Sequence, residues 1–476
     1  MIQVSLSLNH QLLYILNQNY KMRRILFLVM ILSINNLSSQ NKQVLYNFAE
    51  LPQTLLLNPA AETNYKFHFG VPLLSGFSTE FGSSGFGLSD LFAKNNTSIN
   101  DKISTVLNKL KPKDFLKMNT QIEVLSGGFR VNDDIYLSFG FYEEIDAIGY
   151  YPKDIFTLII EGNNSHINKV FNASQLSYKL DVLGVIHAGI TKKIDEKLTI
   201  GGRFKIYSSA LNIESTNNTG TFTTVQGTNN LYTHYFDNVN LNAKTSGLVE
   251  DDEYIQDAGT YLGNTFLGGN LGIGIDVGFT YHLTSQLEFS GSILDLGFIN
   301  HKKNIKNTKV EGSFVYEGVD FLFSDDSSNY WTEINERFKE DLPTTEDGES
   351  YISWRPTKIN AALKYSFGER SSKICYDNRY KDFYTDAIGV QLYSVFRPLG
   401  MQMALTGFYQ KVITEKIYTK ITYTVDDFSA ANIGAGLSAQ FGKVNLYGMF
   451  DNILEYRNLS SANSLSLQLG INVIFN

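Results

Sequence analysis

One stretch of the sequence, "NLGIGIDVGFTYHL" at positions 270–283, alternates between two kinds of residue without a break. Apolar side chains occupy every second position from Leu271 to Leu283, and the positions between them are mostly glycine or polar. Strict alternation predicts a β-strand whose two faces meet different surroundings. This segment is longer than an ordinary strand, which has about five or six residues. It reaches the ~9–11 residues that a tilted strand needs to cross a bilayer.

The same pattern recurs along most of the chain, for example at 65–73, 135–141, 433–441 and 465–475. Strand-like segments number about fourteen, and single-chain bacterial barrels close on an even number of strands. We therefore predict an all-β fold, a transmembrane antiparallel β-barrel of about fourteen strands with a small N-terminal plug. A secreted β-sandwich or propeller is the alternative, but its strands would be shorter and its polar faces would carry more charge.

The segments between the expected strands differ in length. Short turns at 192–197, 284–286 and 442–443 suit the periplasmic end of a barrel, where connections are short. Longer polar stretches at 214–265, 300–350 and 368–384 suit extracellular loops. Three stretches, at about 100–110, 153–162 and 330–340, have a helical pattern, and we expect them in the plug or the loops.

The first forty residues have the pattern of a secretory signal peptide. Three basic residues, Lys21, Arg23 and Arg24, precede an apolar run that ends at Ile34, and small and polar residues follow. We expect residues 1–39 to be removed by cleavage near Ser39–Gln40, with Met22 as the true start of translation. Residues 40–64 would then form an N-terminal plug or hatch, and residues 65–476 the barrel.

Composition excludes several classes of protein. The whole chain has 40 basic and 48 acidic residues, and removal of three basic residues with the signal peptide leaves a net charge of −11 (37 minus 48). This acidity argues against nucleic acid as a partner. The lone cysteine, Cys375, permits neither an intramolecular disulfide nor a cysteine-based metal site, and we interpret it as a buried or interfacial residue.

Signatures of an enzyme are weak, so we expect no catalytic residues, no cofactor and no metal. The glycines of "GIGIDVG", Gly272, Gly274 and Gly278, lie inside a strand pattern and lack the strand-to-helix turn of a dinucleotide site. We expect them to face the lumen. The acidic clusters around 250–253 and 325–326 could bind calcium, but a solvated acidic loop is the favoured interpretation, because no ligand-spaced glycine turn is present.

Two features near the ends of the predicted barrel have a possible function. Asn58, Pro59 and Ala60 end an apolar run just before the first strand. The simplest interpretation is a turn without a specific function, because Asn-Pro starts turns readily. Phe475 closes the last amphipathic strand and is followed by Asn476. A closed barrel must pair its last strand with its first, since lipid cannot satisfy a free strand edge. An aromatic residue at this end also resembles the assembly signal of outer-membrane barrels.

The order of a signal peptide, "LLLNPAAETNYKFHFGVPLLSGFS", "NLGIGIDVGFTYHLTSQLEFSGSILDLGFI" and a terminal amphipathic strand resembles a Bacteroidota family of outer-membrane barrels without a settled activity. That family is similar to the FadL-like barrels, which include the PorV-type barrels. The resemblance covers residues 40–476 and carries over only Asn58, Pro59 and Ala60, which are similar to a motif in the FadL-like N-terminal hatch. It implies a location in the bacterial outer membrane, with lipid, lipopolysaccharide and the barrel-assembly machinery as partners.

Two functions follow from the resemblance and remain open. As in FadL-like barrels, hydrophobic small molecules would pass a plugged lumen through a lateral opening. Alternatively, as in PorV-type and PorP/SprF-type relatives, the barrel would serve as a scaffold or partner in protein secretion or gliding machinery. A barrel enzyme such as a lipase or acyltransferase is the least favoured hypothesis, because it needs a Ser/His/acid set that the sequence does not place.

Overall fold

The computed structural model describes residues 42–48, 51–227, 232–250, 253–317, 330–369, 384–426, 428, 432–457 and 462–475. Several of the sequence predictions therefore lie outside the described residues: the signal peptide at 1–39 with its start at Met22, Cys375, the acidic pair at 325–326, and Asn476.

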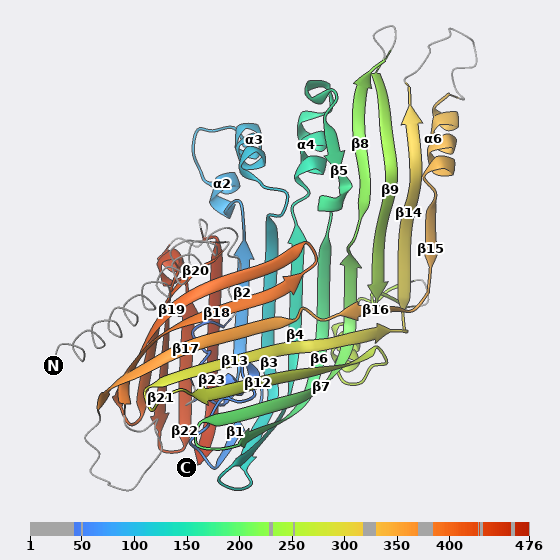
Figure 1. Cartoon of the computed structure of the whole chain (residues 1–476). Helices are drawn as coiled ribbons and strands as arrows, with labels where there is room; N and C mark the ends of the chain where they lie inside the picture. Colours follow the sequence, from blue (N-terminus) through green and yellow to red (C-terminus); the bar gives the residue numbers. More distant parts are fainter. Residues whose placement is uncertain are drawn as a thin grey trace, which may run out of the picture.

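The described strands form a closed antiparallel β-barrel (Figure 1). The ring has fourteen strand positions, as predicted, and β1 with β2 and β16 with β17 each share one position. The last strand, β23, pairs with β22 on one side and with β1 and β2 on the other, which closes the ring. Within the paired strands, backbone groups of the wall find partners in the neighbouring strands, as a barrel in lipid requires. The wall strands are β1 (Phe67–Gly70), β2 (Phe77–Ser83), β3 (Phe115–Arg130), β4 (Ile135–Tyr150), β6 (Tyr178–Lys193), β7 (Leu198–Ser215), β12 (Leu271–His282), β13 (Leu287–His301), β16 (Tyr351–Trp354), β17 (Lys358–Glu369), β18 (Tyr384–Arg397), β19 (Gly400–Thr414), β20 (Ile417–Val425), β21 (Asn432–Phe441), β22 (Val444–Asp451) and β23 (Ser464–Phe475).

The alternation in the sequence becomes the two faces of this wall. On β12, Leu271, Ile273 and Ile275 point outward and are exposed, whereas Gly272 and Gly274 between them are buried on the lumen side, as predicted. The outer face is therefore apolar around the ring and the inner face is polar, which is the pattern of a membrane barrel rather than of a soluble one. In the part of the chain that the structure describes, no helix is both long and apolar enough to cross a bilayer.

The two ends of the barrel carry different connections. The turns at 192–197, 284–286 and 442–443 lie at one end, as predicted. The placement of 368–384 among the extracellular loops is wrong. β17 runs antiparallel to β13, and Tyr365 of β17 pairs with Leu287, which directly follows the 284–286 turn. The strand ends at Glu369 and Tyr384 therefore lie at the end that has the short turns.

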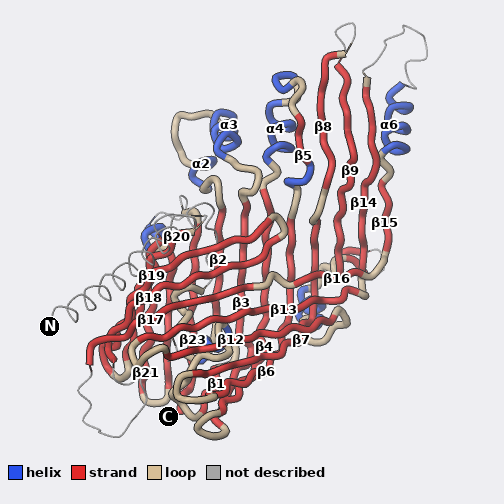
Figure 2. The backbone as a smooth tube through the Cα atoms, viewed as in Figure 1, coloured by secondary structure: helices blue, strands red, loops and turns tan. Residues whose placement is uncertain are grey.

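The opposite end carries helices and strands that extend the sheet of the barrel outward (Figures 1 and 2). The three expected helices are present in these connections as α3 (Ile99–Lys109), α4 (Lys153–Glu161) and α6 (Tyr330–Asp341). The stretches at 214–265 and 300–350, expected as extracellular loops, do connect wall strands at this end, but the sequence did not predict that both contain long strands that continue the barrel wall outward. We call these strands, together with β5, the protruding sheet: β5 (Val170–Asn172), β8 (Thr219–Gln226), β9 (Tyr232–Ser246), β14 (Ile305–Tyr316) and β15 (Thr344–Asp347). The remaining elements are α2 (Leu88–Phe92), α5 (Ala258–Asn264), the hairpin β10 (Val249–Glu250) and β11 (Glu253–Tyr254), and the short 3-10 turns η1 (Pro52–Leu56), η2 (Asn164–His166), η3 (Ala173–Gln175) and η6 (Ile453–Arg457).

The first wall strand is broken, which corrects the continuous strand expected at 65–73. β1 ends at Gly70, and pairing resumes only at Phe77 in β2. Pro72 has no N–H to donate to the ladder, and Leu73 adopts a positive φ of 63°, so a regular strand cannot run through this point. The break turns the Ser75 carbonyl into the lumen, where it accepts a hydrogen bond from the side chain of Gln53.

Candidate functional site

Residues 42–48 and 51–65, which we call the N-terminal segment, pack against inward-facing side chains of the barrel. The segment is largely buried and supplies apolar side chains such as Val44 and Phe48, which contact Tyr447 and Met449 of β22. Five of its backbone carbonyls accept hydrogen bonds from barrel side chains, which pairs these buried acceptors. The pairs are Lys420 to Tyr46 (2.5 Å), Gln410 to Asn47 (3.0 Å), Ser292 to Leu57 (2.6 Å), Thr191 to Pro59 (2.6 Å) and Thr280 to Ala60 (2.9 Å).

The predicted motif Asn58-Pro59-Ala60 forms a turn at the point where this segment meets the wall. Asn58 is only 2% exposed, and its Oδ1 accepts a hydrogen bond of 2.9 Å from the Ala60 N–H. Its Nδ2 donates to the Phe279 carbonyl at 3.3 Å. Asparagine side chains make this kind of local turn readily, and here the same side chain also bonds to β12. The turn and its contact with the wall are thus one structure, and a role as a hatch stays a prediction.

Two inward-facing glycines leave the space that this turn occupies against the wall. A Cβ on Gly201 of β7 would lie 2.1 Å from the Pro59 carbonyl oxygen, and a Cβ on Gly278 of β12 would lie 2.1 Å from Asn58 Oδ1. Both distances are far below contact distance, so a side chain at either position would displace the turn. Gly278 was expected to face the lumen, and the structure gives it this specific neighbour.

The N-terminal segment is also tied to the last strand. Gln53 and Asn472 of β23 exchange two amide hydrogen bonds of 3.0 Å each. Gln53 further donates to Glu123 of β3 at 2.9 Å. Phe475, at the end of β23, packs on Phe67 of β1 with ring centroids 5.5 Å apart. These contacts join the two ends of the chain, and a role of Phe475 in assembly stays a prediction.

A network of buried charges lines the lumen, and the sequence reasoning missed it. It begins on β7, where Arg203 and Lys205 pair with Asp276 of β12 at 3.2 Å and 2.8 Å. Lys205 also pairs with Asp295 of β13 at 2.6 Å, and Asp295 pairs in turn with Lys358 of β17 at 2.9 Å. All of these side chains are almost fully buried, so each charge depends on its partners for stabilisation.

Part of the network crosses the lumen. Arg355 lies in the break between β16 and β17, and its guanidinium reaches Glu144 of β4 at 2.7 Å and Asp181 of β6 at 3.2 Å. Arg397, at the end of β18, pairs with Asp146 of β4 at 2.6 Å. Strands β17 and β18 are not neighbours of β4 and β6 in the ring. These ion pairs therefore link separate parts of the wall across the lumen.

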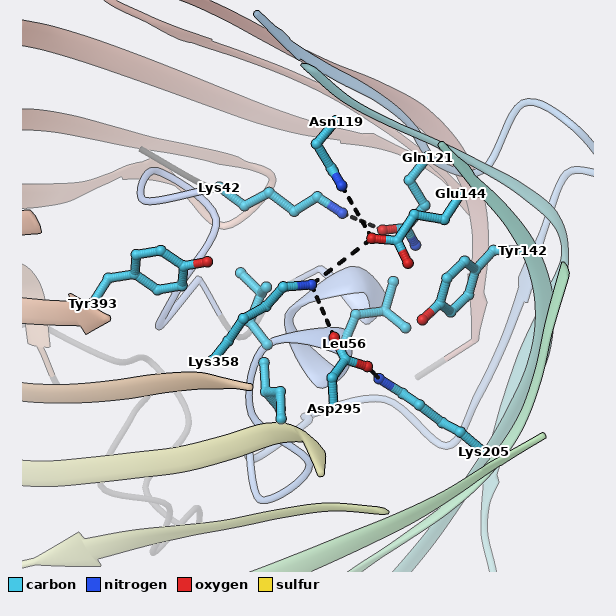
Figure 3. Close-up of a pocket in the computed structure, with 12 residues that line it drawn as sticks. Lys42, Leu56, Asn119, Gln121, Tyr142, Glu144, Lys205, Asp295, Lys358 and Tyr393 are labelled. Atoms are coloured by element: carbon cyan, nitrogen blue, oxygen red, sulfur yellow. Dashed lines mark hydrogen bonds and ion pairs between the residues drawn. The ribbon is translucent and has the colours of Figure 1, made fainter. Parts of the chain in front are cut away.

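A small polar cavity of about 30 Å³ remains where the N-terminal segment meets this network (Figure 3). That volume has room for about one or two water molecules. Lys42 extends into the cavity and donates to Gln121, Glu144 reaches the cavity from beside Gln121, and Lys358 points toward Glu144 from another part of the wall. Burial, together with the nearby charge of Lys358, lowers the pKa of the Lys42 ammonium to about 8. The cavity is too small and too polar to hold an apolar ligand.

A larger and apolar pocket lies outside the barrel, on the protruding sheet. Its volume is about 390 Å³, within the range of roughly 300–1,000 Å³ typical of small-molecule sites. Ile155 and Leu158 of α4 form one wall. The floor belongs to a row of four phenylalanines that face each other across four strands, Phe171, Phe222, Phe236 and Phe314, of which the first three line the pocket. Phe338 of α6 packs edge-on against the other end of this row.

A signal for the ionic network was present in the sequence. Arg203, Lys205 and Asp276 occupy the inward phase of their alternating strands, where most other positions hold small uncharged residues. No such signal exists for Arg355, which lies in a strand break. In the described part of the chain, no three His, Cys, Asp or Glu side chains converge in a way that could hold a metal ion. Of the acidic cluster at 250–253, Glu250 and Glu253 face each other across the β10–β11 hairpin, and the two residues between them lie outside the described residues.

The sequence model of DUF5723, described as a family of unknown function, matches residues 59–451. The chain belongs to this family. No curated protein matches it in sequence. Among solved structures, the DUF5723 protein is similar to the toluene transporter TbuX of Ralstonia pickettii, with 10% identity over 89% of this chain and 94% of that chain and a TM-score of 0.40. It is also similar to a FadL homologue of Pseudomonas aeruginosa, with 8% identity over 92% and 99% of the two chains and a TM-score of 0.42. Toluene is the substrate named for TbuX, and a likeness at this identity and TM-score says nothing about a substrate of this chain.

Proposed function

We propose that this DUF5723 protein is a non-enzymatic outer-membrane barrel that takes up small apolar molecules from outside the cell. The observation that carries the proposal is the apolar pocket on the protruding sheet, where an aromatic floor and an aliphatic wall line an open hollow with the volume of a small molecule. Aromatic and aliphatic surfaces bind apolar molecules by removing them from water. The pocket would be the site where such molecules first bind.

The barrel wall supports the membrane location in this proposal. Large apolar side chains are exposed on the outer face of strand after strand, and exposure of this extent in water is costly. Lipid on this face, and lipopolysaccharide around the rim, would be the surrounding partners. Most of the long connections would then lie outside the cell, as they do in outer-membrane barrels. The barrel-assembly machinery would insert the chain, with Phe475 as part of its signal.

The lumen sets a condition on transport. The N-terminal segment and the ion pairs of Arg355 and Arg397 lie across the path along the axis of the barrel. Charged groups strongly disfavour an apolar solute, so a molecule cannot follow the axis while these contacts hold. Uptake therefore requires either displacement of the N-terminal segment or exit through the wall, which is the route implied by the FadL-like resemblance.

The test changes one side chain that lines the pocket and one neighbour that does not. In Leu158→Asn the pocket wall becomes polar, whereas in the matched control Ile159→Asn a side chain that is 74% exposed and not part of the pocket is altered. We expect Leu158→Asn to weaken binding of the apolar fluorescent probe N-phenyl-1-naphthylamine to the reconstituted protein about tenfold. The same variant should slow uptake of the probe by fractionated outer-membrane vesicles. Equal binding by both variants and the unchanged protein would refute the pocket as the site.

Docking of a protein partner in secretion or gliding machinery is the second candidate. The observation in its favour is β15, an exposed strand at the edge of the protruding sheet that contains Glu346 and Asp347. Exposed strand edges pair readily with another chain. Pull-down from gently solubilised membranes tests this candidate. Recovery of no specific protein by the unchanged barrel, with the same result after Thr345→Pro, would count against it.

A further inference from the structure

A short segment outside the ring, residues 257–269 with α5 at its centre, lies against the outer face of the barrel wall. The direction of neighbouring side chains establishes this position. Tyr142, Leu183 and Tyr207 pack together inside the lumen. Since side chains alternate along a strand, their neighbours Glu143, Gly184 and Ser208 face outward.

These three outward-facing residues are the ones that hold the segment. Thr265 Oγ1 donates to Glu143 Oε1 at 3.1 Å. Ser208 Oγ donates to the Asn264 carbonyl at 2.8 Å and accepts from the Gly268 N–H at 3.1 Å. A Cβ on Gly184 would lie 1.9 Å from the Thr265 carbonyl oxygen, so only glycine permits this approach.

The segment also continues the apolar outer surface of the barrel. Phe266 packs edge-on against Phe141 of β4, with ring centroids 5.8 Å apart. Glu143, Gly184, Ser208 and Leu271 are successive partners in one row of the ladder, and Leu271 is an exposed apolar side chain of the outer face. The segment therefore lies level with the apolar band of the wall and not on the protruding sheet.

The free side of the segment is apolar as well. Leu262 is 59% exposed, Phe266 is 61% exposed and Leu267 is 49% exposed. Three large apolar side chains within six residues favour a nonpolar environment over water. The contact of Thr265 with Glu143 has a matching consequence, because it covers a carboxyl group that would otherwise face the same environment as Leu271.

We propose that residues 257–269 form an interfacial clasp, in which Leu262, Phe266 and Leu267 insert into the outer leaflet of the membrane. The partner is the lipid surface itself, and its acyl chains cover the apolar edge. Short apolar segments that lie in the plane of the interface bind membranes in this way. This inference rests on the membrane location proposed above.

Single cysteines labelled with the fluorophore NBD test the clasp in a Cys375→Ser background. Leu262→Cys and Phe266→Cys report on the segment, Ile273→Cys on the outward face of β12, and Thr344→Cys on the exposed strand β15. The barrels are reconstituted in phosphatidylcholine vesicles with or without a phospholipid that carries a nitroxide at carbon 5. Migration of the unboiled protein on a gel confirms that each variant is folded.

We expect the nitroxide lipid to quench the labels at Leu262 and Phe266 at least half as strongly as the label at Ile273, and to leave Thr344 unaffected. If Ile273 is quenched but the two segment labels behave like Thr344, the clasp is refuted and the membrane location stands. Labels at 262 and 266 that are shielded from both lipid and water would instead indicate a protein partner, and would also refute the clasp. Failure to quench Ile273 would overturn the membrane location itself.

Discussion

At the scale of single residues, glycines on the inner face decide where the N-terminal segment can bind. Gly201 and Gly278 allow the Asn58-Pro59-Ala60 turn to approach the wall at distances that no Cβ would tolerate. Thr191 and Thr280 of the wall donate hydrogen bonds to the turn, and Asn58 of the turn donates one to the wall. The wall therefore fits the turn in shape and also pairs its polar groups. The inner face of a barrel is thus also a specific binding surface for its own chain.

Substitution of adjacent glycines tests this point at Gly201. In Gly201→Ala the new Cβ would lie 2.1 Å from the Pro59 carbonyl, whereas in Gly202→Ala the nearest atom is 3.9 Å away. We expect Gly201→Ala to lower the free energy of unfolding by about 1–3 kcal/mol, the usual cost of overpacking, and to expose the N-terminal segment to protease. Gly202→Ala is the control and should leave both unchanged. Equal protease resistance of the two variants would contradict the role of Gly201.

At the scale of elements, breaks in the wall strands allow residues of the wall to form contacts inside the lumen. The break between β1 and β2 presents the Ser75 carbonyl to Gln53. The break between β16 and β17 lets Arg355 leave the wall and reach Glu144 and Asp181 across the lumen. A regular strand fixes the direction of each residue and pairs its backbone with the next strand. Irregular strands are therefore one means by which distant parts of the wall are connected, beside the long side chain of Arg397 on β18.

Removal of the cross-lumen cation measures the strength of this connection. In Arg355→Ala, two buried carboxylates lose their nearest guanidinium, and breaking a buried ion pair on one side typically costs about 3–5 kcal/mol. In the control Lys109→Ala, an exposed pair with Asp90 at 3.0 Å is removed, which should cost about 0–1 kcal/mol. The measurement is unfolding in urea, followed by the shift of the folded band on a gel. A loss no greater than that of Lys109→Ala would show that the contacts of Arg355 across the lumen do not stabilise the barrel.

At the scale of the whole molecule, closure joins residues from the two ends of the chain. Phe69 of β1 is the partner of Val473 of β23, and Phe67 is the partner of Phe475. A barrel has no free edge, so the last strand completes the hydrogen bonding of the first. This explains why the chain keeps a full amphipathic strand to Phe475.

An engineered disulfide tests closure directly. In a Cys375→Ser background, the pair Phe69→Cys with Val473→Cys should cross-link on mild oxidation, because these residues lie opposite each other in the ladder. The pair Phe69→Cys with Leu469→Cys is the control, since Leu469 is the partner of Phe77. We expect a reductant-sensitive change in gel mobility for the first pair only. Cross-linking of neither pair in the folded protein would argue against a closed ring.

The sequence by itself determined the elements whose pattern is local. Alternation fixes which side of β12 meets the outside, short turns fix the hairpins, and helical periodicity fixes α3, α4 and α6, because each signal depends only on neighbours along the chain. The strands of the protruding sheet escaped prediction because few of their side chains are deeply buried on either face, so no strict alternation results. The end at which 368–384 emerges depends on the direction of β17, which pairing with β13 sets. Only the tertiary structure decided that Arg355 meets Glu144 and that Pro59 meets Gly201, since these contacts join residues far apart in the chain across a lumen that exists only after closure.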